Sequence, residues 1–151
     1  MFSLFKRKPL LSQEENQQIV KAIQEAEQNT SGDIRVYVES RCKFMDPLDR
    51  AKEVFAQLKM GNTEKRNGVL LYIALKDRQL AVFGDAGIHE KTGEEYWQQA
   101  VNLMISHFNK ENYVEGICAC VKEIGDDLKD HFPYDKDTNR NELPDDIVFG
   151  R

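Results

Sequence analysis

Apolar residues along the chain follow two spacings, one typical of strands and one typical of helices. Residues 33–39 alternate apolar and polar side chains, which predicts a strand with one strongly buried face. Residues 69–75 are nearly all apolar and predict a central strand that is covered on both faces. Lys76-Asp77 predicts a tight turn, after which residues 78–83 run back as an antiparallel strand.

Four further segments carry apolar residues at helical spacing. Each begins at a residue type that caps helices, with Glu or Pro in its first turn. The predicted helices start at Ser12, Asp46, Thr92 and Asn112, and the first and third begin with the capping boxes Ser-Gln-Glu-Glu and Thr-Gly-Glu-Glu. The residues that we expect these helices to bury are Ile19, Val20, Ile23, Ala26, Leu48, Ala51, Val54, Phe55, Leu58, Tyr96, Trp97, Ala100, Val101, Met104, Ile105, Phe108, Val114, Ile117, Cys118, Val121, Ile124 and Leu128.

The order of these elements is αβαββαα, which predicts an α/β fold: a three-layer α/β/α sandwich around a small mixed sheet. The helix between the first two strands makes them parallel through a right-handed crossover. We expect one domain at residues 12–132, preceded by a flexible N-terminus at residues 1–11. The periodicity ends after this domain, so residues 133–151 are expected to form a disordered acidic tail.

Composition and charge change this picture little, but they exclude several classes of function. The net charge of −5 argues against nucleic-acid binding, which requires a basic surface. No apolar run approaches the ~18 residues of a membrane-spanning helix, and the N-terminus lacks the order of an export signal. The three cysteines are an odd number, which fits a reducing compartment. We therefore expect a cytoplasmic monomer with no membrane span.

No complete catalytic motif is present in the sequence. A P-loop, G-x-S-x-G, H-E-x-x-H and a nucleotide-binding fingerprint are all missing. His107 and His131 have no obvious nucleophile near them in the sequence. A catalytic centre that pairs Ser or Cys with His is therefore not supported.

The predicted strand directions bring three polar segments to one edge of the sheet, where the two parallel strands start and the antiparallel strand ends. Carboxylate, amide and carbonyl oxygens at this edge are the ligands that Ca²⁺ and Mg²⁺ prefer. We predict a metal site formed by Asp33, Asn67 and Asp85, with Glu94 from the segment that follows. The alternative is that these residues only form turns, because strand ends collect Gly, Asn and Asp.

The opposite edge of the sheet is a second candidate, because ligands of open α/β sheets usually bind at the carboxyl ends of parallel strands. Asp46 and Asp49 also suit the first turn of a helix, which is the competing explanation for them. We expect Lys76-Asp77 only to reverse the chain. The residues gathered at this edge are Glu39, Ser40, Arg41, Asp46, Asp49, Lys76 and Asp77.

Three stretches, T-S-G-D-I-R-V-Y-V, R-N-G-V-L-L and F-G-D-A-G-I, resemble in order and spacing the TPM domain family of thylakoid lumen phosphatase-like, photosystem-repair and receptor-modulating proteins. The resemblance covers about residues 12–132 and is strongest to small stand-alone bacterial members. It implies an α/β/α sandwich, divalent-cation binding and, in plant members, a debated acid phosphatase activity. Many members carry a signal peptide and a membrane anchor, and this sequence shows neither. The residues that match the family's motifs are Gly32, Asp33, Asn67, Gly68, Gly84, Asp85 and Gly87.

Three hypotheses for the function follow. The first is a regulatory or interaction module that binds Ca²⁺ or Mg²⁺ at the edge of the sheet. The second is a weak metal-dependent acid phosphatase, in which the carboxylates hold the metal and Arg66 holds phosphate. The third is an adaptor that binds an unidentified protein partner without metal. Because the sequence supplies no clear nucleophile or acid, we lean against an enzyme.

Overall fold

The computed structural model describes residues 10–93, 97–110, 112–134 and 148–149. The elements in this part of the chain are α1 (Gln13–Glu27), β1 (Asp33–Glu39), α2 (Pro47–Gln57), β2 (Gly68–Ala74), β3 (Gln79–Gly84), α3 (Ala86–Thr92), α4 (Gln98–Asn109), α5 (Tyr113–His131) and β4 (Val148–Phe149).

The strands form one mixed sheet in the order β3-β2-β1-β4. β1 and β2 are parallel, with Asp33 opposite Gly68, and β3 returns antiparallel to β2 with Gly84 opposite Val69. β2 lies between two strands and all of its residues are buried, which confirms its predicted central position.

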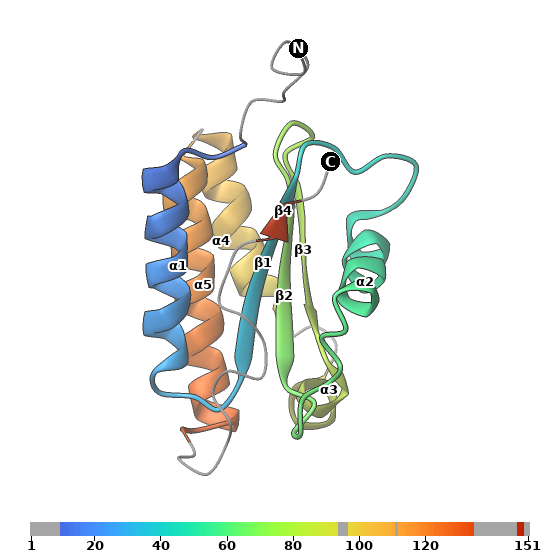
Figure 1. Cartoon of the computed structure of the whole chain (residues 1–151), viewed down its shortest axis with the longest axis vertical. Helices are drawn as coiled ribbons and strands as arrows, with labels where there is room; N and C mark the ends of the chain where they lie inside the picture. The colour runs from blue at the N-terminus through green and yellow to red at the C-terminus, as the bar shows by residue number, and fades with distance from the viewer. Residues whose placement is uncertain (1–9, 94–96, 111, 135–147, 150–151) are drawn as a thin grey trace, which may run out of the picture.

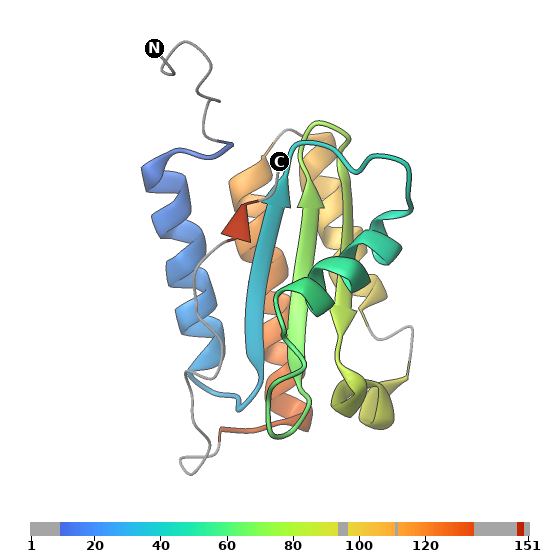
Figure 2. The same cartoon turned by 45° about the vertical axis from the view of Figure 1, so that its right-hand side comes forward.

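Helices cover both faces of the sheet, which confirms the predicted α/β/α sandwich (Figures 1 and 2). α1, α4 and α5 lie on one face, where they bury the strand residues at even positions of β1, such as Ile34, Val36 and Val38. α2 lies on the other face and crosses β2 and β3, where it packs against Leu70 and Tyr72. The sheet separates the two cores, so β1, β2 and β3 each contribute side chains to both.

β1 differs from the prediction of one strongly buried face, because all seven of its residues are buried. The polar side chains of Arg35 and Glu39 are only 6% and 2% exposed. Arg50 reaches from α2 to Glu39 and lies over the ring of Tyr37, so the polar side of β1 is covered by ionic and aromatic contacts. The alternation in this sequence therefore indicates that one face of β1 is apolar and the other polar, although both faces are buried.

The predicted capping box at Thr92 is wrong. Thr92 ends the short helix α3 instead of starting a helix, and its hydroxyl donates to the carbonyl of Ile88 at 2.8 Å. α4 begins later, at Gln98, and Trp97 caps it without a side-chain hydrogen bond. The two glutamates of this Thr-Gly-Glu-Glu motif lie outside the described residues. The first capping box, between Ser12 and Glu15, is confirmed.

The ends of the domain also differ in part from the prediction. Leu11 is 5% exposed and belongs to the main core, so the folded part begins before residue 12. Within the tail predicted to be disordered, Val148 and Phe149 form β4, which pairs in parallel with β1. The rest of the predicted termini, residues 1–9, 135–147 and 150–151, lies outside the described residues. None of the helices in the described part of the chain combines the length and apolar character that crossing a membrane requires.

α1 and α5 pack closely at Gly125. A Cβ atom at this position would lie 2.6 Å from the Cβ of Ala26, so Gly125→Ala should push the two helices apart. We expect a loss of about 2 kcal/mol in the free energy of unfolding, measured by urea denaturation. Lys129→Ala, an exposed change on the same helix, is the control. A stabilised Gly125→Ala variant, as helix propensity alone would give, would contradict this close approach.

Asp127 on α5 should make stability depend on pH. Burial raises its pKa from 3.8 to about 6, and repulsion by Glu123, Asp130 and Asp126 adds to this, whereas His131 lowers it. The folded state therefore binds the proton more tightly than the unfolded state. The stability that Asp127 contributes falls as the pH rises from about 4 to about 6, and is constant above.

Asp127→Asn should remove this slope. At pH 7 the variant should be more stable than the natural chain by about 1 kcal/mol, a figure reduced because Asp127 is half-exposed. Urea denaturation of both proteins between pH 4 and pH 7 measures the difference. A difference that stays constant over this range would refute the raised pKa.

Candidate metal centre at the edge of the sheet

The starts of β1 and β2 and the end of β3 meet at the lower edge of the sheet in Figure 1, beside α3. Asp33 opens β1 opposite Gly68, the first residue of β2. Asp85 follows the last residue of β3, and its backbone N–H donates to the carbonyl of Gly68 at 3.0 Å. Asp33 and Asp85 therefore flank Gly68 from the two neighbouring strands, in one row across the sheet.

Both aspartates project from the face of the sheet that α2 covers. Tyr37 of β1 and Ala81 of β3 pack on that face, and each lies four positions from its aspartate, so the alternation of an extended chain gives the same side. Asp33 and Asp85 are 3% and 4% exposed. Gly68 has no side chain, so nothing of its own fills the space between the two buried carboxylates.

Hydrogen bonds of the backbone and of side chains hold Asn67 and the segment before β1 in place. The carbonyl of Asn67 accepts from the N–H of Asp33 at 3.4 Å, and its amide donates to the hydroxyl of Ser31 at 3.4 Å. The Ser31 N–H donates to the carbonyl of Phe132 at 2.9 Å, and the Thr30 hydroxyl donates to the same carbonyl. The end of α5 thereby fixes the position at which β1 starts.

Asp85 has two structural partners. Its side chain caps α3 by accepting from the N–H of Ala86 at 2.7 Å. The guanidinium of Arg66 donates hydrogen bonds to both oxygens of the same carboxylate, at 2.7 and 2.9 Å. This hydrogen bonding to Asp85 raises the pKa of Arg66 above its usual value. Sequence reasoning did not find this ion pair, because the two residues are 19 positions apart.

Three of the four predicted ligands lie at this edge of the sheet. Asp33, Asn67 and Asp85 are all buried at this edge, whereas Glu94 lies outside the described residues. His89, which follows on α3, faces the ring of Phe83 at 6.1 Å between ring centres. Among the described residues, no three His, Cys, Asp or Glu side chains come close enough together to hold a metal ion. A metal at this edge would therefore need amide, carbonyl or water oxygens as well.

At the opposite edge of the sheet, several of the candidate side chains pair with one another or with neighbouring residues. Both oxygens of Glu39 bind Arg50, at 2.9 and 3.1 Å, and the hydroxyl of Tyr72 also donates to Glu39. Burial first, and then the contact with Glu39, raise the pKa of Tyr72 above its ordinary value. Arg41 and Asp77 form an ion pair at 3.0 Å, so Asp77 does more than reverse the chain. These contacts engage Glu39, Arg41 and Asp77, three of the residues that made this edge a candidate site.

Asp46 and Asp77 are also used structurally. The Asp46 side chain accepts from the N–H of Leu48 at 3.0 Å and caps α2, as predicted. The Asp77 carboxylate accepts from the N–H of Cys42 at 2.7 Å and holds the loop after β1.

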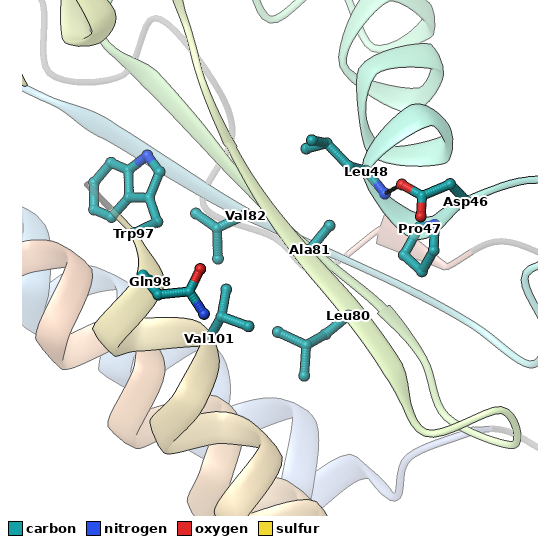
Figure 3. Close-up of a pocket in the computed structure, with 9 residues that line it drawn as sticks. All are labelled: Asp46, Pro47, Leu48, Leu80, Ala81, Val82, Trp97, Gln98 and Val101. Carbon is teal, nitrogen blue, oxygen red and sulfur yellow. Dashed lines mark hydrogen bonds between the residues drawn. The ribbon is translucent and has the colours of Figure 1, made fainter. Parts of the chain in front are cut away.

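An apolar pocket of about 290 Å³ lies beside β3, between the starts of α2 and α4 (Figure 3). Apart from Asp46 and Gln98, its lining side chains are apolar, and Asp46 is already engaged as a helix cap. This lining holds a single carboxylate, that of Asp46, and no second acidic or basic side chain to pair with it. The residues that line the pocket are Asp46, Pro47, Leu48, Leu80, Ala81, Val82, Trp97, Gln98 and Val101.

Comparison with known proteins agrees with this architecture. The sequence profile of the TPM domain matches residues 5–127, which is most of the chain. This chain belongs to the TPM domain family. The BA42 protein from the psychrophilic bacterium Bizionia argentinensis, whose structure was solved by NMR, is 38% identical to it. The comparison covers 97% of this chain and 99% of BA42, with a TM-score of 0.86.

Two more distant structures share the fold of this TPM domain. The N-terminal domain of a protein from P. gingivalis is 21% identical with a TM-score of 0.68, over 82% of this chain and 79% of that domain. The N-terminal domain of the cg2496 protein from Corynebacterium glutamicum is 18% identical with a TM-score of 0.63, over 79% of this chain and 74% of that domain. At this identity the likeness supports the fold alone.

The network around Glu39 should contribute to stability rather than to ligand binding. Glu39→Gln would leave the mostly buried guanidinium of Arg50 without its main counter-charge, so we expect a loss of about 2 kcal/mol in the free energy of unfolding. Asp77→Asn, at the more exposed pair with Arg41, should cost less than about 1 kcal/mol. Urea denaturation of both variants measures the difference. Equal losses would show that burial of the first pair has no energetic consequence.

Proposed function

We propose that this TPM domain is a binding module for a divalent hard cation, Ca²⁺ or Mg²⁺, held between Asp33 and Asp85 at the edge of the sheet. The observation that carries the proposal is the row of two buried carboxylates with Gly68 between them. Two buried carboxylates on one face of a sheet, with a glycine between them in the row, are an arrangement that a cation stabilises.

The dimensions of the sheet support this proposal. Neighbouring strands lie about 4.8 Å apart, so the Cα atoms of Asp33 and Asp85, two strands apart, are separated by about 10 Å. Two aspartate side chains that point towards each other can span this distance with one ion between them, at about 2.4 Å from each oxygen. A side chain at position 68 would occupy the position of the ion, so the proposed site requires glycine there.

The donor set fits hard cations. Carboxylates and the amide oxygen of Asn67 are hard ligands, and backbone carbonyls of the same segments can add to them. Mg²⁺ keeps several waters and often uses only one or two carboxylates, so it needs no cluster of three acidic side chains. Asp33 and Asp85 would hold the ion, and the ion would supply a fixed positive charge at this edge of the sheet.

The phosphatase alternative receives less support from the geometry. In that mechanism Arg66 holds phosphate, but its guanidinium binds Asp85 with two hydrogen bonds. Of the pocket's two polar side chains, Asp46 caps α2 and Gln98 is an uncharged amide. We therefore place the function in binding, with regulation or interaction as its consequence.

Titration of the ¹⁵N-labelled protein with CaCl₂ or MgCl₂, followed by NMR, tests this function. We expect saturable shifts in segments 31–33, 66–68 and 84–87. Asp33→Asn and Asp85→Asn should each weaken binding at least about tenfold, because each removes a charged ligand. Asparagine still caps helices, so Asp85→Asn should keep α3.

Asp77→Asn is the matched control, because it removes the same charge at the opposite edge of the sheet. Its affinity should equal that of the natural chain. Shifts that spread over all acidic surfaces, or an equal loss in all three variants, would refute a specific site at this edge.

A further inference from the structure

The ion pair between Asp85 and Arg66 points to a role for Arg66 in the proposed cation site, and this inference rests on the proposed function. We propose that the Arg66 guanidinium is a resident cation of this site, which holds Asp85 when no metal is bound and which a divalent cation has to displace. Arg66 would thereby set both the affinity of the site and its preference for divalent over monovalent ions.

The geometry of the ion pair carries this inference. Nε of Arg66 lies 2.7 Å from one oxygen of Asp85, and Nη2 lies 2.9 Å from the other. The second oxygen also accepts from the N–H of Ala86. A metal ion bound to the same carboxylate would lie close to the guanidinium, and two positive charges beside one carboxylate repel each other. The two cations therefore compete for Asp85.

The backbone of Arg66 is held more firmly than its side chain. Its backbone has φ of 52°, a left-handed conformation that is uncommon for a residue with a side chain. The carbonyl of Arg66 accepts from the N–H of Gly87 at 2.9 Å, and a Cβ at Gly87 would lie 2.7 Å from that carbonyl oxygen. Contact with α3 thus fixes the backbone of Arg66 beside the site.

The side chain, by contrast, can leave without rearranging the fold. It is 53% exposed, whereas the side chain of Asp85 is 5% exposed. Departure of the guanidinium into water opens one side of Asp85 and leaves the cap on α3 in place. A monovalent ion gains little by replacing an equal charge that already makes two hydrogen bonds, whereas a divalent ion gains the additional charge.

The test is calorimetric titration of the full chain with CaCl₂ and with MgCl₂. Arg66→Gln should bind the divalent ion about five- to tenfold more tightly than the natural chain, because no guanidinium has to be displaced. Arg66→Lys keeps the charge but loses the two-pronged contact, so its affinity should fall between the two.

Arg41→Gln is the matched control. Arg41 is similarly exposed, at 55%, and pairs with Asp77 at the opposite edge, so this change alters the net charge equally without touching the site. Its affinity should stay within about twofold of the natural chain. A second reading is the NMR signal of the Arg66 Nε–H group, which should move to the position of a solvated arginine as metal saturates the site.

The outcomes separate the two proposals. Binding by the natural chain with equal or weaker binding by Arg66→Gln would overturn the role of Arg66 and leave the metal site standing. Binding by Arg66→Gln alone would support the competition and refute metal binding by the natural chain. Failure of all variants to bind, while their thermal unfolding shows that they are folded, would overturn both proposals.

Discussion

The parallel pairing of β1 with β2, with Asp33 opposite Gly68, is the contact on which the edge of the sheet depends. Since β3 returns antiparallel, the start of β1 and the end of β3 reach the same edge and place Asp33 and Asp85 on either side of Gly68. A slip of one residue would move a whole set of side chains to the other face of the sheet. The apolar core that fixes this register also fixes the relation between the two carboxylates.

The two edges of the sheet show how similar residues serve different ends. Ligands of open α/β sheets usually bind where parallel strands end, yet here that edge holds Glu39, which is closed off by Arg50 and Tyr72. At the other edge the residue between Asp33 and Asp85 is Gly68, which has no side chain, and the cation that pairs with Asp85 belongs to the half-exposed side chain of Arg66. The difference lies in what surrounds each carboxylate, because both edges contain buried acids.

Much of the fold could be predicted from the sequence because its signals are local. Alternation and apolar runs marked the three long strands, and strand directions then brought Asp33 and Asp85 to one edge. The second capping box failed because a Thr-x-x-Glu pattern looks the same whether or not a helix already precedes it. The pairing of Arg66 with Asp85 could not be predicted, since it depends on how a turn packs against α3. Such contacts arise only once the sheet has brought distant segments together.

Paramagnetic broadening by Mn²⁺ is the measurement that tests most directly where a cation binds. Mn²⁺ prefers the same hard oxygen ligands and broadens NMR signals of nearby nuclei. The account predicts that substoichiometric Mn²⁺ broadens the amide signals of Asp33, Gly68 and Asp85 first, and that excess Mg²⁺ restores them. Broadening that is strongest in the acidic last turns of α5, around Asp126 and Asp130, with these three signals unchanged, would contradict a metal site at the edge of the sheet.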